Sequence, residues 1–430
     1  MKILPIAALL FATGVQAAPF ASPAELRSNI ATLVGFGTRH TLSSPIDPKR
    51  GIGAARKWAA SRFEQYSKAC GGCLKVEMVS DRFTGPRAPG GVDIVNVMAI
   101  LRGADPDRVI MVSAHIDSRV TDVMNSTADA PGANDDGSGS ALVLETARLL
   151  SKEHPKATIV FALLSGEEQG LFGGQLLART AKMRGWKVAA LLNNDIVGNT
   201  HGIGGQHIDD RVRVFSEGIR SVETLEEGKM RRGIGGEDDG PSRALAKYID
   251  HIATVAKPGL DVLAIRRPDR FQRGGDHSPS LDMGYPAVRI TEATENYDRQ
   301  HQDLRTENGR TYGDTIDGVD FSYLARVTDL NLAALRALAM APAAPDSATI
   351  VGALSNNTTV RWSAVGGAAK YRVYWRRADG IDWTDHKDVA GTELVLKDVN
   401  IDDNFFAVAA LAEDGSESIA TFCAGQPRKN

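Results

Sequence analysis

Three apolar runs in the first half of the chain end abruptly in polar sequence. Residues 109–114 stop at His115, residues 158–164 stop at Ser165-Gly166-Glu167-Glu168, and residues 188–192 stop at Asn193-Asn194-Asp195. Short, continuously apolar runs bounded by turn residues are typical of strands buried on both faces. Open α/β sheets gather their ligands where such strands give way to loops, so these three endings predict a functional edge.

Helical spacing of apolar residues alternates with these runs. It predicts helices over residues 54–69, 140–151, 170–180, 241–255 and 321–338, and further strands over residues 94–101, 260–265 and 287–291. Strands that alternate with helices in this way predict an α/β domain with a mixed, mostly parallel sheet and helices on both faces. The glycine-rich stretches at 204–207 and 233–239 do not lead from a strand into a helix, so we expect at most mobile loops near the cleft there.

The pattern changes after a small, proline-rich stretch at residues 339–346. Such composition is typical of a linker. Beyond it, short β-branched or aromatic runs at 358–362, 370–376, 393–396 and 405–411 are broken by turn residues, which predicts a small β-sandwich. With Trp362 and Tyr371 as core residues, this part resembles a fibronectin type III domain. We therefore divide the chain into a leader at 1–17, a main domain at 18–341 and a β-sandwich at 346–430.

The leader has the pattern of a secretory signal peptide. Lys2 precedes the apolar residues 3–15, and Val15-Gln16-Ala17 is typical of a cleavage site. The apolar stretch is too short for a membrane span, and no later stretch approaches the roughly 18 apolar residues that a span needs. We expect a secreted or periplasmic protein whose mature chain starts near Ala18 and does not cross a membrane.

Charge and cysteine content narrow the function further. The chain has 50 Lys and Arg residues against 53 Asp and Glu, which offers no basic surplus for nucleic acid or an anionic membrane. Cys70-Gly71-Gly72-Cys73 suits a local disulfide in an oxidising compartment better than a redox motif, which needs a thioredoxin-like context, or a zinc ribbon, which needs a second C-x-x-C. We expect Cys423 to be a buried or half-buried thiol.

Six polar residues carry the candidate chemistry. They lie in S-A-H-I-D, P-G-A-N-D-D-G-S-G, S-G-E-E-Q-G, N-N-D-I-V-G-N and Y-D-R-Q-H-Q-D, and they are His115, Asp135, Glu167, Glu168, Asp195 and His301. Each fragment alone has an ordinary explanation as a polar strand end, a solvated loop or a turn. Two imidazoles and three carboxylates suit zinc, a carboxylate can bridge two ions, and a further carboxylate beside a ligand can take a proton from water. Together they predict a two-zinc hydrolase.

In this order the motifs, with G-F-G-T-R-H near residue 35, resemble the M28 zinc aminopeptidases over about residues 24–338. The resemblance implies the zinc exopeptidase type of fold and two zinc ions per chain. It implies that Asp135 bridges the ions and that Glu167 is the general base. It also implies a cis peptide between Asp135 and Asp136. By the same resemblance His115 and Asp195 complete one zinc site, Glu168 and His301 complete the other, Asp117 orients His115, and His277 lies near the substrate pocket.

We expect cleavage at the N-terminal end of peptide substrates. Surplus acid around the metals, at Asp136, Glu167, Asp195 and Asp276, favours binding of a free ammonium. Arg273 and Arg299 are the counter-evidence, although solvated loop charges are their simpler interpretation. A carboxypeptidase or dipeptidase on the same two-zinc site, a one-zinc hydrolase or cyclase, and a catalytically silent binding protein are the alternatives. The sequence does not specify an oligomeric state.

Overall fold

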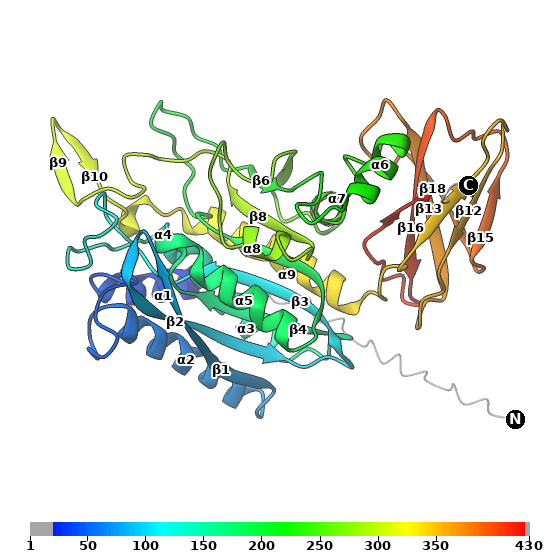
Figure 1. The fold of residues 1–430 in the computed structure, drawn as a ribbon. Coiled ribbons are helices and arrows are strands. Elements are labelled where there is room, and N and C mark those ends of the chain that lie inside the picture. The colour runs from blue at the N-terminus through cyan, green and yellow to red at the C-terminus, as the bar shows by residue number, and fades with distance from the viewer. Residues whose placement is uncertain (1–19, 426–430) are drawn as a thin grey trace, which may run out of the picture.

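The computed structural model describes residues 20–425. The expected signal peptide at 1–17 therefore lies outside the described residues. The larger unit is built on an eight-stranded sheet, and a smaller β-sandwich lies beside α6 (Leu225–Ile234) at one end of the molecule (Figure 1). Within residues 20–425, no helix has the length and apolar character that crossing a membrane requires.

The sheet of the larger unit is mixed and mostly parallel, as the sequence predicts. Its order is β1 (Leu74–Gly85), β2 (Ala88–Leu101), β4 (Ala157–Leu164), β3 (Asp105–His115), β5 (Lys187–Asn194), β8 (Ala287–Glu292), β6 (Arg211–Phe215) and β7 (Asp261–Ile265). The four middle strands β4, β3, β5 and β8 run parallel, whereas β1, β2 and β6 introduce antiparallel pairs. The carboxyl ends of the middle strands therefore meet along one edge.

Helices cover both faces of this sheet. One face packs against α1 (Pro23–Gly35), α2 (Ile52–Ala69), α3 (Gly137–Leu150), α7 (Pro241–Ala256) and α9 (Phe321–Met340), and the other packs against α5 (Phe172–Met183) and α8 (Ser278–Leu281). Along β3, Ile110 and Val112 enter the first core while Val109 and Met111 enter the second, because successive strand residues point to opposite faces. A strand buried on both faces needs the continuous apolar run that the sequence has.

Two short elements and one hairpin complete the larger unit. They are α4 (Glu167–Gly170), the 3₁₀ helix η1 (Ile316–Gly318), and the hairpin of β9 (Arg305–Glu307) and β10 (Arg310–Tyr312). The expected disulfide is present between Cys70 and Cys73 at the end of α2.

The expectation of a loop at 233–239 is wrong for its first part. Residues 225–234 form α6, whose N-terminus carries a capping box in which Thr224 and Glu227 accept each other's backbone N–H. Gly235 ends the helix with φ 74°, a conformation that glycine adopts at little cost. The capping-box pattern T-x-x-E at Thr224–Glu227 could have predicted the start of this helix from the sequence. The glycines at 233–236 favoured the interpretation as a loop.

The C-terminal unit consists of two four-stranded sheets around one small core. One sheet has the order β15 (Glu393–Leu396), β12 (Thr358–Trp362), β11 (Ala348–Val351), β18 (Ala424–Gly425), and the other β14 (Asp385–Val389), β13 (Lys370–Arg377), β16 (Asn404–Leu411), β17 (Thr421–Phe422). Trp362 and Tyr371 lie in the core with ring centroids 5.5 Å apart. Cys423 is buried there as a free thiol, as expected.

Charged and polar contacts join the two units. Asp239 of the larger unit lies 2.7 Å from Lys247 Nζ and 2.5 Å from an Nη atom of Arg376 in β13, and all three side chains are largely buried. The Tyr248 hydroxyl donates to the Glu417 carbonyl at 2.9 Å, and Ile419 packs against the main core. The sandwich is therefore docked on the larger unit through paired charges, on the side of α6 and α7.

Candidate metal centre

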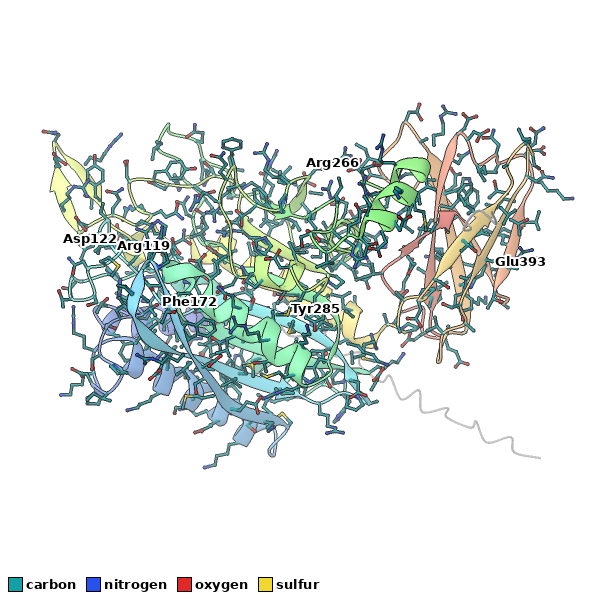
Figure 2. All side chains as sticks on the ribbon, viewed as in Figure 1. Arg119, Asp122, Phe172, Arg266, Tyr285 and Glu393 are labelled. Atoms are coloured by element: carbon teal, nitrogen blue, oxygen red, sulfur yellow. A yellow bond between two sulfur atoms is a disulfide. The ribbon has the colours of Figure 1, made fainter. Side chains whose placement is uncertain are left out.

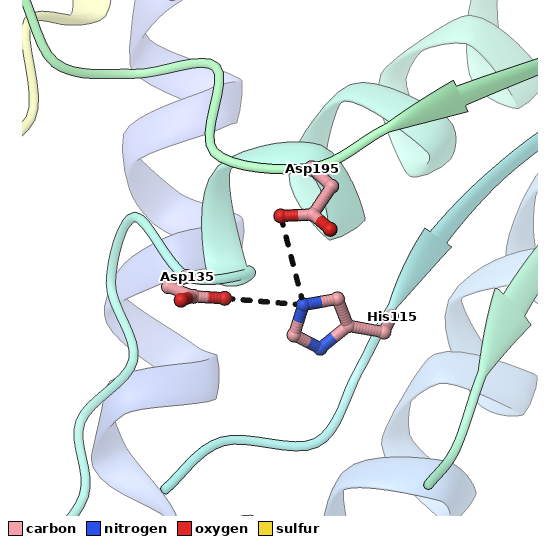
Figure 3. A group of neighbouring side chains, drawn as sticks. All are labelled: His115, Asp135 and Asp195. Carbon is pink, nitrogen blue, oxygen red and sulfur yellow. Dashed lines mark ion pairs between the residues drawn. The ribbon is translucent and has the colours of Figure 1, made fainter. Parts of the chain in front are cut away.

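The candidate residues converge at the carboxyl edge of the middle strands. His115 is the last residue of β3, Glu167 and Glu168 open α4 directly after β4, and Asp195 follows β5. Asp135 lies two residues before α3, and His301 lies in the loop that follows β8. Parallel strands bring these segments together although up to 186 positions separate them in the chain. Figure 3 shows Asp135 and Asp195 both approaching the same nitrogen of the His115 imidazole.

Two groups of three potential ligands share Asp135. His115 Nε2 lies 3.1 Å from Asp135 Oδ1 and 3.9 Å from Asp195 Oδ1. On the other side, His301 Nε2 lies 2.8 Å from Asp135 Oδ2 and 2.9 Å from Glu168 Oε1. Within each group the ligand atoms lie within 4.8 Å of one another. One carboxylate thus turns one oxygen to each group, which is the arrangement a bridging ligand requires.

The donor set of these groups fits zinc. Imidazole nitrogens and carboxylate oxygens are ordinary zinc ligands. Glu168 Oε1 is buried and lies 2.9 Å from His301 Nε2 without a well-aligned hydrogen bond, so this oxygen is available for a cation. Burial would raise the pKa of Asp135, but the two imidazoles outweigh it and hold that pKa well below its ordinary value. The site stabilises an ionised carboxylate where a bridging ligand must be ionised.

Glu167 lies next to this ligand set without belonging to either group. Burial raises the pKa of its carboxyl well above the ordinary value; His115 opposes this shift, while Glu168, Asp195 and Asp276 add to it. Among residues 20–425 its carboxylate has no hydrogen-bonding or ion-pairing partner. A carboxylate with a raised pKa and free oxygens can accept a proton and release it again.

Asp117 lies beside His115 and also holds the turn after β4. The nearest acceptor to His115 Nδ1 is the backbone carbonyl of Asp117 at 3.1 Å, and the carboxylate lies 3.7 Å away. The carboxylate also accepts the backbone N–H groups of Gly166, Glu167 and Glu168 at 2.9, 3.3 and 3.2 Å. Asp117 therefore holds the turn from which Glu167 and Glu168 project.

Asp136 and His277, which we expect near the substrate, are both buried beside the ligand set. Asp136 is fully buried and accepts backbone N–H groups from His115, Gly139 and Ile196 at 3.0–3.2 Å, so it caps α3 and ties it to two strand ends. His277 is also fully buried, and its Nε2 donates to the Pro268 carbonyl at 2.8 Å. Their side chains serve the packing around the site. The Asp135–Asp136 peptide bond is cis, as the resemblance implies.

Asp276 is the third residue expected to contact substrate. It is 1% exposed, its Oδ1 accepts the Gly174 N–H at 3.0 Å, and its buried Oδ2 has no partner among the described residues. Burial raises the pKa of Asp276 to about 7, with His115 opposing and Asp117 adding to the shift. Its charge adds to the raised pKa of Glu167, so Asp276 is a second proton-binding group near the ligand set.

Several residues that support the ligands were missed from sequence. Fully buried Arg39 donates to the Ile116 and Gly132 carbonyls at 2.7 and 2.8 Å. Asp314 Oδ2 accepts the Asp135 N–H at 2.7 Å, which fixes the loop before α3. Arg289 Nη1 lies 2.7 Å from Asp195 Oδ2, and Arg119 Nε lies 2.7 Å from Glu168 Oε2. A signal for Arg289 was available, because this charged residue stands between the apolar Val288 and Ile290 in a predicted strand.

Each of the two arginines weighed as carboxylate receptors has an acidic partner. Arg273 Nη1 lies 3.2 Å from Glu295 Oε2, and Arg299 donates to Thr315 Oγ1 at 2.8 Å and lies 3.1 Å from Asp317 Oδ2.

Arg119, which contacts the ligand set, lies near Asp122 at the end of the molecule opposite the sandwich residue Glu393 (Figure 2). The metal centre and the sandwich are therefore far apart.

Known proteins resemble this chain in sequence and in fold. The family model of peptidase family M28 matches residues 96–334. A protein of Leptosphaeria maculans with the name "Probable zinc metalloprotease" is 44% identical over 408 residues, which cover 93% of this chain and 94% of the relative.

Solved structures add the fold. An aminopeptidase from Aneurinibacillus sp. aligns over 73% of this chain and 93% of its own with TM-score 0.51 and 14% identity. Porphyromonas gingivalis glutaminyl cyclase aligns over 74% of this chain and 99% of its own with TM-score 0.51 and 17% identity. These two structures share a fold but carry names of different reactions, so the fold alone does not decide the chemistry.

Proposed function

Since the chain belongs to peptidase family M28 and is a zinc-dependent peptidase, we propose a more specific function. In this proposal it is a two-zinc exopeptidase that removes the N-terminal residue of peptides. The observation that carries the proposal is the shared carboxylate, since Asp135 turns one oxygen to each of two complete ligand groups. A single-metal enzyme has no use for the second group.

The residues divide into ligands and a base. His115, Asp135 and Asp195 would hold one zinc ion, and Asp135, Glu168 and His301 the other. When bound, zinc supplies a Lewis acid that polarises the scissile carbonyl and lowers the pKa of water. Glu167 accepts the proton of the attacking water and delivers it to the leaving amine, for which its raised pKa suits it. Asp117 positions Glu167 by binding the backbone N–H groups of the turn.

Excess negative charge supports the choice of the N-terminal end. Glu167 and Asp276 add carboxyl groups beyond the ligand set, and both have raised pKa values because of burial and neighbouring acids. An ammonium group would relieve this repulsion, whereas a substrate carboxylate would add to it. The pairing of Arg299 with Thr315 and Asp317 weakens the carboxypeptidase alternative.

Export is part of the proposal. The disulfide between Cys70 and Cys73 suits an oxidising compartment, in agreement with the signal-peptide pattern at 1–17. The two-sheet C-terminal unit is proposed to be a fibronectin type III-like domain, with Trp362 and Tyr371 in its core.

Blocked peptides test the direction of cleavage. We expect the zinc-loaded protein to cleave a short peptide with a free amine, to lose that activity when the amine is acetylated, and to keep it when the C-terminus is amidated. The opposite pattern would make the protein a carboxypeptidase.

Elemental analysis should find close to two zinc ions per chain, and full activity with one ion would contradict the two-zinc site.

A further inference from the structure

A chain of ion pairs runs from the metal centre to the surface. It starts at Asp195, whose Oδ2 lies 2.7 Å from Arg289 Nη1. Arg289 Nη1 lies 3.5 Å from Asp269 Oδ2, and Asp269 Oδ1 lies 3.0 Å from Arg270 Nε. Arg270 Nη1 in turn lies 3.3 Å from Glu295 Oε2. Buried groups thus connect a metal-ligand candidate to the segment 266–273, which contains four arginines.

The chain ends in a group of arginines around Glu295. Arg213 Nη2 lies 2.7 Å from Glu295 Oε1, and Arg273 Nη1 lies 3.2 Å from Glu295 Oε2. Exposure of the arginine side chains rises outward, from 0% at Arg289 to 9% at Arg270 and 36% at Arg273. A guanidinium has five N–H donors, so Arg273 keeps donors that face solvent.

Cations outnumber anions in this network. Four guanidinium groups face three carboxylates, and one of the three is the expected zinc ligand Asp195. Burial would raise the pKa of Asp269 and of Glu295, but neighbouring arginines outweigh it and lower both, to about 2 for Asp269. Both carboxylates are therefore ionised at neutral pH and cannot neutralise all four arginines.

The same segment borders the catalytic turn. Gly274 packs against Leu171, the residue that ends α4, and Arg289 Nη1 approaches Gly275 closely. Asp276 then accepts the N–H of Gly174 in α5. Residues 273–276 therefore lie between the surplus arginines and the turn that carries Glu167 and Glu168.

We propose that Arg273, supported by Arg270 and Arg213, forms a carboxylate-binding subsite at the rim of the metal centre, and that this peptidase prefers peptides with an acidic residue next to the cleaved bond. The inference rests on the proposed N-terminal peptidase function and adds a substrate class to it. A side-chain carboxylate would accept from the outward donors of Arg273 and match the surplus positive charge, while the free amine remains on the acidic side of the site.

Matched peptide pairs test the subsite. The pairs are Glu-Ala-Ala-amide with Gln-Ala-Ala-amide, and Ala-Glu-Ala-amide with Ala-Gln-Ala-amide, which differ only in one charge. We expect kcat/KM to be about 10-fold or more higher for the glutamate member of one pair, as a charge-assisted hydrogen bond provides. Arg273→Gln should bring that ratio close to one, and Arg273→Glu should invert it.

Arg266 provides the matched control. It belongs to the same segment, its side chain is 41% exposed, and it lies 3.6 Å from Asp238 outside the network. Arg266→Gln should leave the ratio unchanged. A binding measurement gives a readout that does not depend on turnover. Calorimetry should show that the zinc-loaded Glu167→Gln variant binds free glutamate more tightly than glutamine. This preference should disappear when Arg273→Gln is added to that variant.

The outcomes separate this inference from the proposed function. If no peptide with a free amine is cleaved, the proposed function fails. Cleavage with glutamate-to-glutamine ratios near one in both pairs would overturn the acidic preference alone. Equal effects of Arg273→Gln and Arg266→Gln on the ratio would overturn the assignment to Arg273. The assignment would also fail if Arg273→Gln lowered only the cleavage of a dipeptide with a free C-terminal carboxylate, such as Ala-Ala, and left the glutamate-to-glutamine ratio unchanged.

Discussion

Neighbouring residues in the Glu167–Glu168 pair have opposite environments. Glu168 lies against His301 and Arg119, and these cations outweigh the effect of burial and lower the pKa of its carboxyl. Glu167 has no such partner among the described residues, and burial raises its pKa. The helical turn of α4, held by Asp117, aims the two side chains apart. One position is thereby suited to a ligand and the next to a base.

Replacement of Glu167 should separate these roles. In Glu167→Gln we expect kcat to fall by roughly 10²-fold or more, because the amide cannot accept the proton of water. Zinc content and melting temperature should stay close to those of the wild type, since no ligand is lost. Glu168→Gln is the matched control and should lose zinc as well as activity. Near-normal turnover in Glu167→Gln would place the base elsewhere.

At the scale of elements, the first turn of α5 holds Asp276 in place. Gly174 donates its N–H to Asp276 Oδ1, and a Cβ at this position would lie 2.5 Å from the Asp276 carbonyl oxygen and 2.8 Å from Oδ1. Helix and segment 273–276 can approach this closely only because residue 174 lacks a side chain.

A methyl group at this contact should therefore disturb the site. We expect Gly174→Ala to lower the free energy of unfolding by about 1–3 kcal/mol, as overpacking does, and to lower kcat/KM because Asp276 must move. At Gly233 in α6 a Cβ would meet no atom within 4 Å, so Gly233→Ala should be neutral or slightly stabilising. Denaturant unfolding and kinetics of both variants test this, and equal stability of the two would contradict the tight contact.

At the scale of the whole molecule, Arg119 beside the metal centre and Glu393 of the sandwich lie far apart (Figure 2). All candidate ligands and Glu167 precede residue 342, so truncation after Ala341 should leave zinc binding and hydrolysis in place. The fragment should melt at a lower temperature, because Asp239 loses Arg376 and the packing of Ile419 is removed. A soluble fragment without zinc or activity would show that the sandwich supports the site.

The same interface should make stability depend on pH. Burial raises the pKa of Asp250 in α7, and Asp382 of the smaller unit adds to it. At pH values between the ordinary aspartate pKa and the raised one, the folded state therefore binds more protons than the unfolded state. The free energy of unfolding falls as pH rises through that window, and the loss persists at higher pH.

Removal of this charge should relieve the deficit. We expect Asp250→Asn to melt up to about 2 °C above the wild type at pH 7.5. The gain should shrink as pH falls through about 4 and disappear below about 3, where the carboxyl is protonated in both states. Melting curves of both proteins at each pH measure the difference, and a gain independent of pH would contradict the titration of Asp250.

The sequence alone determined the parts of the protein that depend on local pattern. Continuous apolar runs predicted β3, β4 and β5 because strands buried on both faces need apolar residues at every position. Helical spacing predicted α2, α3, α5, α7 and α9 within a few residues, and the polar strand ends contained three of the five candidate ligands, His115, Glu168 and Asp195. The family resemblance then implied which of them share a metal, and the structure brings those residues together in the same two groups.

Only the tertiary structure decided which groups meet across the chain. It showed that Asp117 binds the Glu167–Glu168 turn and that Asp136 caps α3, because a carboxylate takes whichever backbone N–H groups the fold presents to it. It also placed Arg289 against Asp195 and gathered Arg213 and Arg273 around Glu295. Pairings between charges on distant segments follow from sheet order and loop packing, and these have no local signature in the sequence.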